Sequence, residues 1–453
     1  MQKALVRDLN AILQGELIHD TARFAGITLR PETTQVLSQN PRGKDLACLN
    51  RWLLEDAYPL ELSRDPIRKP AGSISDIAPT YWKAYKRDVT WPSSFIIIPG
   101  AIYEQYGDVR VLQEHYDGMK KWIEYMLSFE KDGLMPQDRW GDWCFPPEAS
   151  KVGLPEDPKR QTAGKVLGTT YFYHDLRLMA RFASILGKPD DARRFDEVAE
   201  RIKSAFNKRY LNAAAAIYDN GSETSFVLPL AFGMVPPENR QAVFENLARK
   251  ISVDDRGHLA TGLVGTQWIC RVLSDNGRPD ITYTLASQTT YPSWGYMIGR
   301  GATTIWENWW ADRDNREFDG SGNHVMLVGD LVIWLVEYVA GIRPDIERPG
   351  FKHIIVRPHP LGDLKFAKAS HVSMYGTVQS RWTREGGKFT LDLVIPPNTT
   401  ATVYLPATGV ATVTEGGRPV GQAEGVKFVK MDKETAISEV VSGAYRFASE
   451  IRP

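Results

Sequence analysis

Residues 171–206 read YFYHDLRLMARFASILGKPDDARRFDEVAERIKSAF, and this stretch predicts two helices joined by a three-residue connection. Apolar residues recur at three- and four-residue steps in its first half, at Phe172, Leu176, Met179, Phe182, Ala183 and Leu186. Gly187 suits the end of that helix, and Pro189 suits the first turn of the next, which is expected from about Asp190 to Phe206. So short a connection makes the two helices antiparallel neighbours.

Similar helix pairs recur through the first three quarters of the chain. The segment 111–129 has the same apolar spacing, and further helical segments are expected near residues 45–60, 91–130, 230–255, 260–275 and 324–340. No repeat of fixed period accompanies them, which argues against a regular solenoid. Up to a dozen antiparallel helices in one unit favour a closed double ring, so we expect an (α/α)6 barrel over residues 1–345.

The pattern changes after residue 345, where short runs alternate between apolar and polar residues. Apolar residues follow period two in two successive runs, at Phe389, Leu391, Leu393 and Ile395 and then at Ala401, Val403 and Leu405. The tripeptide Glu-Gly-Gly at 385–387 is typical of a hairpin turn. The sequence therefore predicts a mainly α protein with a C-terminal β-sandwich over residues 346–453.

The charge balance and the cysteines exclude several classes of partner. Lys and Arg total 55, and Asp and Glu total 55, so the chain lacks the basic surplus that favours nucleic acid or an anionic membrane. The three cysteines, Cys48, Cys144 and Cys270, match no metal-binding spacing and no disulfide framework. We therefore expect no metal and no cofactor.

The sequence also bears on location. The first eight residues lack the apolar core of a signal peptide. The most apolar long segment, 324–341, contains Asp330 and Glu337, so it is expected to be a buried helix and not a membrane span. The default expectation is a cytoplasmic protein, and the alternative is a secreted or periplasmic parent whose leader has been removed.

The stretch Gly-Ala-Thr-Thr-Ile-Trp-Glu-Asn-Trp-Trp at 301–310 places one carboxylate, Glu307, among three indoles. A charge beside tryptophan is costly to bury unless it has a partner or a role. Flat aromatic faces beside a carboxylate suit a sugar, since the faces cover its C–H patches and the carboxylate can transfer a proton. The alternative is a core helix with one surface glutamate.

Several stretches, in this order and spacing, resemble glycoside hydrolase family 78, the α-L-rhamnosidases. They are Ser-Asp-Ile-Ala-Pro at 75–79, Trp-Pro-Ser-Ser-Phe at 91–95, Tyr-Glu-Gln-Tyr-Gly-Asp at 103–108, Gly-Asp-Trp at 141–143, Gln-Thr-Thr-Tyr-Pro-Ser-Trp-Gly-Tyr at 288–296, Gly-Ala-Thr-Thr-Ile-Trp-Glu at 301–307, Asn-His at 323–324 and Ile-Ile-Val-Arg-Pro-His at 354–359. The resemblance covers residues from about 70 to 410, and it implies a helical barrel followed by a sandwich.

The resemblance implies an inverting hydrolase that releases terminal α-L-rhamnose from glycosides or oligosaccharides, with two carboxyl groups on either side of the scissile bond. It assigns the general base to Glu307 and implies that the substrate contacts are Asp76, Trp91, Trp143, Trp294 and His324. The residues by themselves leave alternatives open. Asp76 could cap a helix, Trp143 could belong to the core, and His324 could be a structural histidine.

The early motif that carries the family's proton donor departs from its usual form here. The corresponding stretch is 19–35, where counting back from Gln35 places the donor near Ala25 or Gly26 and no carboxyl group is present. Asp20 keeps the approximate register of the first acid of the motif, and we take it as the candidate donor. Glu16 and Glu32 are the nearest alternatives.

Three hypotheses about function follow. The first is an α-L-rhamnosidase whose only expected partner is a carbohydrate substrate, with the oligomeric state open. The second is a weakly active or non-catalytic sugar-binding homologue, because the donor motif is degenerate. The third is a hydrolase or lyase of another sugar on the same barrel, since a fold does not fix a substrate. The β-domains that usually precede the barrel in this family are not apparent, so the chain is expected to be a fragment or a minimal form.

Overall fold

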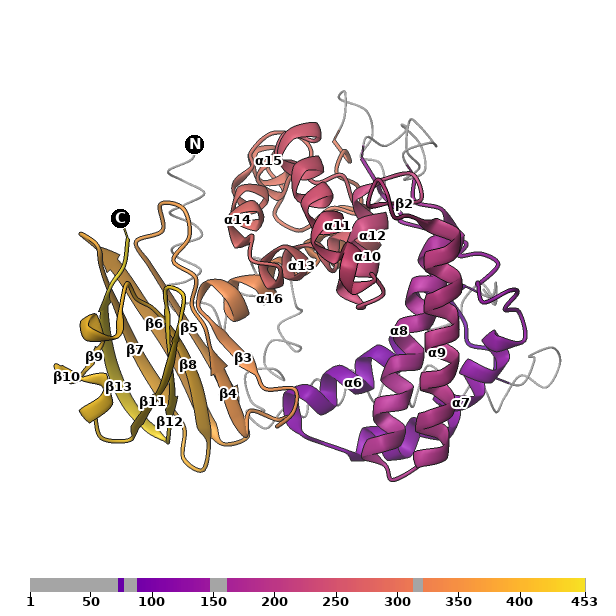
Figure 1. Ribbon diagram of the computed structural model, residues 1–453. Coiled ribbons are helices and arrows are strands. Elements are labelled where there is room, and N and C mark those ends of the chain that lie inside the picture. Colours follow the sequence, from indigo (N-terminus) through magenta and orange to yellow (C-terminus); the bar gives the residue numbers. More distant parts are fainter. Residues whose placement is uncertain (1–71, 77–87, 147–160, 313–320, 453) are drawn as a thin grey trace.

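The computed structural model describes residues 72–76, 88–146, 161–312 and 321–452. It confirms the predicted helix pair, as α8 (Gly164–Ile185) and α9 (Pro189–Tyr210) pack side by side (Figure 1). Gly187 adopts a positive φ of 69°, and the N–H of Lys188 donates to the Ala183 carbonyl at 2.8 Å. This is how a glycine ends a helix and reverses the chain.

The apolar stripes of the two helices form the core between them. Five of the predicted positions in α8 are buried, namely Phe172, Leu176, Met179, Phe182 and Ala183. The buried face of α9 includes Ala192, Phe195, Ala199 and Ile202. Helix α8 starts earlier than predicted because Val166 and Leu167 extend its buried face. Helix α9 carries acidic residues in its first turn and basic residues in its last, which complements the helix dipole.

The other described helices continue around a common centre (Figure 1). They are α6 (Ser94–Tyr106), α7 (Arg110–Leu127), α10 (Glu223–Ala231), α11 (Pro237–Arg249), α12 (Leu263–Thr266), α13 (Ile269–Asp275), α14 (Pro279–Ser287), α15 (Trp294–Gly299) and α16 (Leu331–Trp334). A π-helical turn extends α11 over Lys250–Asp254, another extends α16 over Leu335–Val339, and the short strands β1 (Leu211–Asn212) and β2 (Ile217–Tyr218) pair after α9. The fold is the expected six-hairpin helical domain, although the pair expected near 45–60 lies outside the described residues.

The C-terminal part is a sandwich of two sheets, as predicted. One has the order β10-β9-β13-β7-β6-β5 and the other β11-β12-β8-β4-β3. The strands are β3 (Ile342–Pro344), β4 (His353–Val356), β5 (Phe366–Ser373), β6 (Gly376–Glu385), β7 (Lys388–Ile395), β8 (Thr400–Pro406), β9 (Thr414–Glu415), β10 (Arg418–Pro419), β11 (Val426–Asp432), β12 (Thr435–Val440) and β13 (Gly443–Glu450). Strands β4 and β8 pair in parallel, and the other pairs are antiparallel.

The period-two pattern and the predicted hairpin are both confirmed. The alternating apolar residues of β7 and β8 point into the core between the sheets and are at most 2% exposed. Gly386 and Gly387, with φ of 55° and 77°, connect β6 to β7. Two consecutive positive φ angles are what a two-residue hairpin turn requires, and glycine accepts them without strain.

The two parts of the chain meet through buried hydrogen bonds. Strand β3 starts at Ile342, three residues before the boundary expected at 345. The indole N–H of Trp382 donates to the Val339 carbonyl at 2.8 Å, and the hydroxyl of Ser380 donates to the Ala340 carbonyl at 2.7 Å. All of these groups are fully buried, so the inner face of the sandwich is fastened to the end of the last helical segment.

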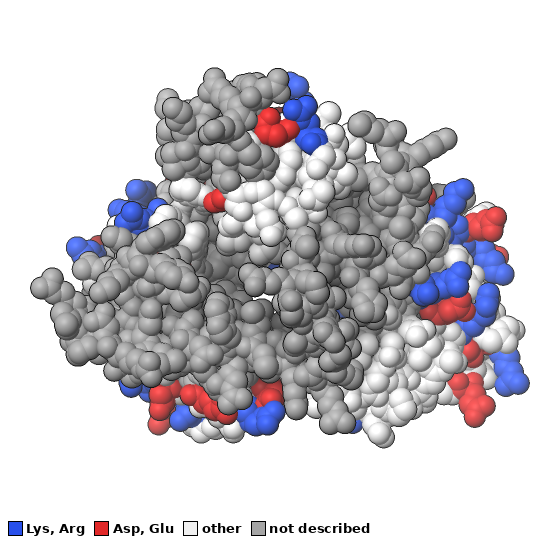
Figure 2. Space-filling model, turned by 180° about the vertical axis from the view of Figure 1, so that it is seen from behind, with Lys and Arg blue, Asp and Glu red and all other residues white. Residues whose placement is uncertain are grey.

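The surface carries charges of both signs. Figure 2 shows the molecule from behind, with Lys and Arg side chains interspersed with Asp and Glu side chains on the described part of the surface. This agrees with the equal totals of 55 basic and 55 acidic residues. None of the described helices combines the length and the apolar character needed to cross a lipid bilayer.

Replacing the buried Leu391 of β7 tests the sandwich core. Leu391 is 0% exposed, so Leu391→Ala should lower the free energy of unfolding by about 2–5 kcal/mol through lost burial and a residual cavity. Lys388→Ala, at an exposed position of the same strand, should change it by less than about 0.5 kcal/mol. Chemical denaturation measures both, and equal effects would contradict the assigned register.

Candidate active site

The segment 301–310 is irregular and not helical, so the alternative of a core helix with a surface glutamate is wrong. Glu307 is half-buried, and its Oε2 accepts a hydrogen bond from the Ser321 N–H at 2.9 Å. The N–H of Glu307 donates to the Ser321 carbonyl, also at 2.9 Å. This pair of bonds fixes both the backbone and the carboxylate of Glu307.

Buried contacts anchor the two residues that follow Glu307. The carbonyl oxygen of the Asn308 side chain accepts from the thiol of Cys144 at 2.9 Å. The indole N–H of Trp309 donates to the Thr261 carbonyl at 3.4 Å. Both tie the Glu307 segment to elements that lie far away in the sequence.

His324 lies beside this segment, because its N–H donates to the Ile305 carbonyl at 2.7 Å. Its ring is half-buried, and Nδ1 is a buried atom with no hydrogen-bond partner among the described protein groups. An imidazole nitrogen can accept from or donate to a hydroxyl group. The ring therefore has spare hydrogen-bonding capacity next to Glu307.

Three tryptophans form an aromatic wall. Trp91 and Trp140 stack with their ring centroids 5.1 Å apart and their planes 16° apart, and Trp143 meets Trp140 edge-on at 6.2 Å. The guanidinium of Arg139 lies 5.2 Å from the centre of the Trp140 ring. Sequence reasoning identified Trp91 and Trp143 but missed Trp140, although it stands only three residues before Trp143.

Asp76 supports this wall from behind. It is 4% exposed, and its Oδ2 accepts from the indole N–H of Trp140 at 3.2 Å. Residues 77–87 are not described, so the alternative that Asp76 caps a helix stays untested. A direct contact of Asp76 with substrate also stays a prediction.

Two buried carboxyl groups clamp the backbone on either side of the wall. Asp88 accepts from the N–H of Arg139 at 2.8 Å, and Asp138 accepts from the N–H of Thr90 at 3.0 Å. Asp88 therefore bonds to the residue that follows Asp138, and Asp138 bonds to the residue two positions after Asp88. Burial and the nearby Asp138 raise the pKa of Asp88 from 3.8 to about 8, which leaves the Asp88 carboxyl protonated near neutral pH.

A third buried acid, Asp142, joins the wall to the Glu307 segment. Its carboxylate accepts from the N–H groups of Gly262, Val264 and Gly265 at 2.9, 2.9 and 3.0 Å and from the hydroxyl of Thr224. The N–H of Leu263 donates to the Trp143 carbonyl at 2.8 Å. The backbone of residues 261–263 thus bonds to Trp143 through the N–H of Leu263 and to Trp309 through the carbonyl of Thr261.

The remaining predicted site residues are Trp294 and Asp20. Trp294 is 3% exposed, donates to the Leu327 carbonyl at 2.7 Å and packs against Trp309 with centroids 6.0 Å apart. This position suits support of the Glu307 segment better than contact with a sugar. Asp20 and its alternatives, Glu16 and Glu32, lie outside the described residues.

The raised pKa of Asp88 predicts the sign of a change in stability with pH. The pKa of Asp88 is higher in the folded protein than in the unfolded chain, so its contribution to stability is complete below pH 3.8 and is lost as the pH rises to about 8. Asp88→Asn has no group that titrates at this position. Its free energy of unfolding, minus that of the parent, should therefore increase between pH 4 and pH 8.

Denaturation at a series of pH values measures this difference. Asp117→Asn, an exposed carboxylate on α7, serves as the control and should give a difference that does not change over the same range. A flat difference for Asp88→Asn as well would show that Asp88 is ionised in the folded protein.

Two family models match the chain in succession. One is described as the bacterial alpha-L-rhamnosidase 6 hairpin glycosidase domain and matches residues 60–339. The other is described as the bacterial alpha-L-rhamnosidase C-terminal domain and matches residues 341–418. The two matches meet where the last helical segment gives way to β3.

Individual relatives agree with these matches. The chain is 34% identical over 381 residues to an alpha-L-rhamnosidase of Streptomyces avermitilis, and 31% identical over 385 residues to one of Formosa agariphila. These alignments cover 83% and 84% of the chain but only 34% and 40% of the relatives. The chain therefore spans little more than a third of the length of the curated relatives it matches.

Solved structures give the same picture. The alpha-L-rhamnosidase of Streptomyces avermitilis complexed with L-rhamnose superposes with a TM-score of 0.78 at 32% identity, covering 89% of this chain and 36% of that one. The native alpha-L-rhamnosidase of Aspergillus terreus superposes with a TM-score of 0.76 at 25% identity, covering 90% of this chain and 43% of that one.

Proposed function

Because the chain belongs to the bacterial α-L-rhamnosidase six-hairpin glycosidase family, we propose that it binds terminal α-L-rhamnose and hydrolyses α-L-rhamnosides with inversion. One observation carries the proposal. Glu307 is half-buried and held by Ser321, and buried contacts connect its segment to the tryptophan wall. The same segment accepts the N–H of His324 at the Ile305 carbonyl, and Nδ1 of His324 has no hydrogen-bond partner among the described groups.

In this proposal Glu307 is the general base. The Ser321 N–H fixes the orientation of its carboxylate, which removes a proton from the attacking water. His324 binds a sugar hydroxyl through Nδ1, and the indoles of Trp91 and Trp143 cover the C–H faces of the ring. The water adds on the side opposite the leaving oxygen, so the configuration at the anomeric carbon inverts.

The proton donor of this mechanism is a carboxyl group in the stretch 16–32, with Asp20 as the first candidate. A glycosidic oxygen leaves poorly unless it is protonated, and general acid catalysis is worth about 10²–10⁴-fold. If no carboxyl group of this stretch reaches the leaving oxygen, the same wall and histidine would make the chain a sugar-binding homologue.

Replacing Glu307 by glutamine tests the base. Glutamine keeps an oxygen that can accept from Ser321 but cannot take a proton, so Glu307→Gln should lower kcat by about 10²–10⁴-fold while rhamnose still binds. Hydrolysis of an aryl rhamnoside and calorimetry with rhamnose measure the two effects. Glu347→Gln, an exposed control, should change neither. Full activity of Glu307→Gln would remove this residue from the mechanism.

The donor can be identified by comparing leaving groups. An aryl rhamnoside with a good leaving group needs little acid assistance, whereas a rhamnosyl disaccharide needs it fully. Asp20→Asn should therefore slow hydrolysis of the disaccharide by about 10²–10⁴-fold and that of the aryl substrate much less.

The same comparison for Glu16→Gln and Glu32→Gln completes this experiment. A selective loss in one of these variants, and not in Asp20→Asn, would transfer the role of donor to it. Rhamnose binding without hydrolysis of either substrate by the parent chain would favour the sugar-binding alternative. A panel of other aryl glycosides separates rhamnosidase activity from action on a different sugar.

A further inference from the structure

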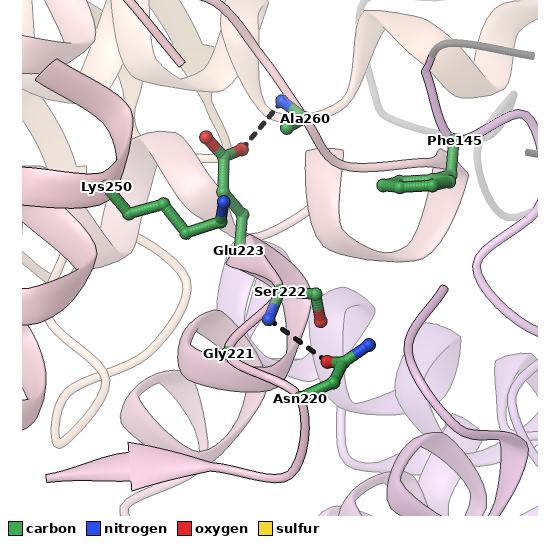
Figure 3. A pocket seen from close by; sticks show the side chains of 7 residues that line it. All are labelled: Phe145, Asn220, Gly221, Ser222, Glu223, Lys250 and Ala260. Atoms are coloured by element: carbon green, nitrogen blue, oxygen red, sulfur yellow. Dashed lines mark hydrogen bonds between the residues drawn. The ribbon is translucent and has the colours of Figure 1, made fainter. Parts of the chain in front are cut away.

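A small cavity opens at the start of α10, close to the segments that carry Trp143 and Glu307. It has a volume of about 90 Å³ and is lined by Phe145, Asn220, Gly221, Ser222, Glu223, Lys250 and Ala260 (Figure 3). Glu223, in the first turn of α10, is 0% exposed, and none of the proposed catalytic steps uses it.

The carboxyl group of Glu223 makes two kinds of contact. Its Oε2 accepts from the N–H of Ala260 at 2.8 Å, as the dashed line in Figure 3 shows. Its Oε1 is a buried atom with no hydrogen-bond partner among the described groups, and the charge of Asp255 acts on this carboxyl group.

Three charged or titratable groups lie here on two neighbouring segments. Lys250 starts the π-helical turn after α11, Asp255 follows the end of that turn, and Nζ of Lys250 lies 3.0 Å from Oδ2 of Asp255. Burial, together with the charge of Asp255, raises the pKa of Glu223 well above its usual value, and the Lys250 charge opposes this only in part.

We propose that Glu223 is a positioning residue for the sugar site, whose buried carboxyl group holds Ala260 in place through the Ala260 N–H. This inference rests on the proposed function, since it concerns residues assigned to the same site. Glu223 itself does not touch the sugar.

The contacts that lead from Ala260 to the site are all close and buried. The next residue, Thr261, accepts the indole N–H of Trp309, two residues after Glu307. Gly262 then bonds to Asp142, and Leu263 bonds to the Trp143 carbonyl. A displacement of Ala260 therefore acts on the flank of Glu307 and on the wall at the same time.

On the side that faces Asp142 and Trp143 there is almost no free space to absorb such a displacement. A Cβ on Gly262 would lie 2.3 Å from the Trp143 carbonyl oxygen and 2.4 Å from that of Asp142, so the two segments are already in close contact. When Glu223 loses its proton, two neighbouring carboxylates repel each other, and Ala260 has to move or the pair has to take up water. Binding of the sugar should weaken as a result.

Two substitutions of Glu223 in the full chain separate this role from others. Gln matches the shape of the protonated acid, since its oxygen accepts from Ala260 and its NH₂ can donate to Asp255. Glu223→Gln should therefore keep the kcat/KM of the parent near neutral pH and abolish the alkaline loss of rhamnose affinity that the parent shows. Glu223→Ala should lower kcat/KM by about 10- to 100-fold, mainly through KM.

Two outcomes would overturn the proposal. One is that Glu223→Gln is as damaging as Glu223→Ala, which would mean that an ionised carboxylate is needed. The other is that Glu223→Gln and the parent share the same alkaline loss. Glu238→Gln, an exposed carboxylate on α11, is the control and should follow the parent throughout.

A second measurement tests the positioning role even if the chain shows no hydrolysis. Tryptophan fluorescence of the parent and of Glu223→Gln, titrated toward alkaline pH without any sugar, should show a transition in the parent that the variant lacks. This result does not depend on hydrolysis, so a parent chain without activity would contradict the proposed function and leave the positioning role measurable. Identical fluorescence titrations would overturn the positioning role even in an active enzyme.

Discussion

The site depends on one buried carboxylate, that of Asp142, which accepts four hydrogen bonds. Three of these come from the backbone N–H groups of Gly262, Val264 and Gly265 at the start of α12, where a helix leaves its donors unpaired. An acid in this position satisfies those donors and complements the positive end of the short helix. Because Asp142 immediately precedes Trp143, the same contact also fixes where the tryptophan wall stands relative to the Glu307 segment.

The aromatic wall needs such supports because its indoles are only partly covered by other apolar groups. Asp76 holds the N–H of Trp140, while Asp88 and Asp138 hold the backbone on either side of Trp91 and Trp140. Buried acids are costly unless they are bonded or protonated. All three are bonded here, and burial raises the pKa of Asp88 and of Asp138. Buried polar groups thus hold the three indoles in place.

The sequence was sufficient to predict helices and strands, but it did not reveal the buried acids that hold the site in place. Periodicity placed α8, α9 and the strands β7 and β8, because apolar spacing reflects burial directly. Glu307 and His324 were predicted from motifs, and the structure bonds the N–H of His324 to the carbonyl of Ile305, two residues before Glu307. Asp88, Asp138 and Glu223 were missed because their roles come from partners about 30 to 50 residues away, which spacing along one chain does not reveal.

The fastening between Trp382 and Val339 has a consequence for how the chain can be divided. The sandwich carries its own core, yet an indole and a hydroxyl of that core find their acceptors only in the last helical turn. A cut at this junction would leave two buried donors without acceptors and would open a hydrophobic face on each piece. The sandwich therefore completes its hydrogen bonds only together with the helical domain. A sandwich transferred to a related protein would need two backbone carbonyl groups in the same positions at the end of the last helical turn.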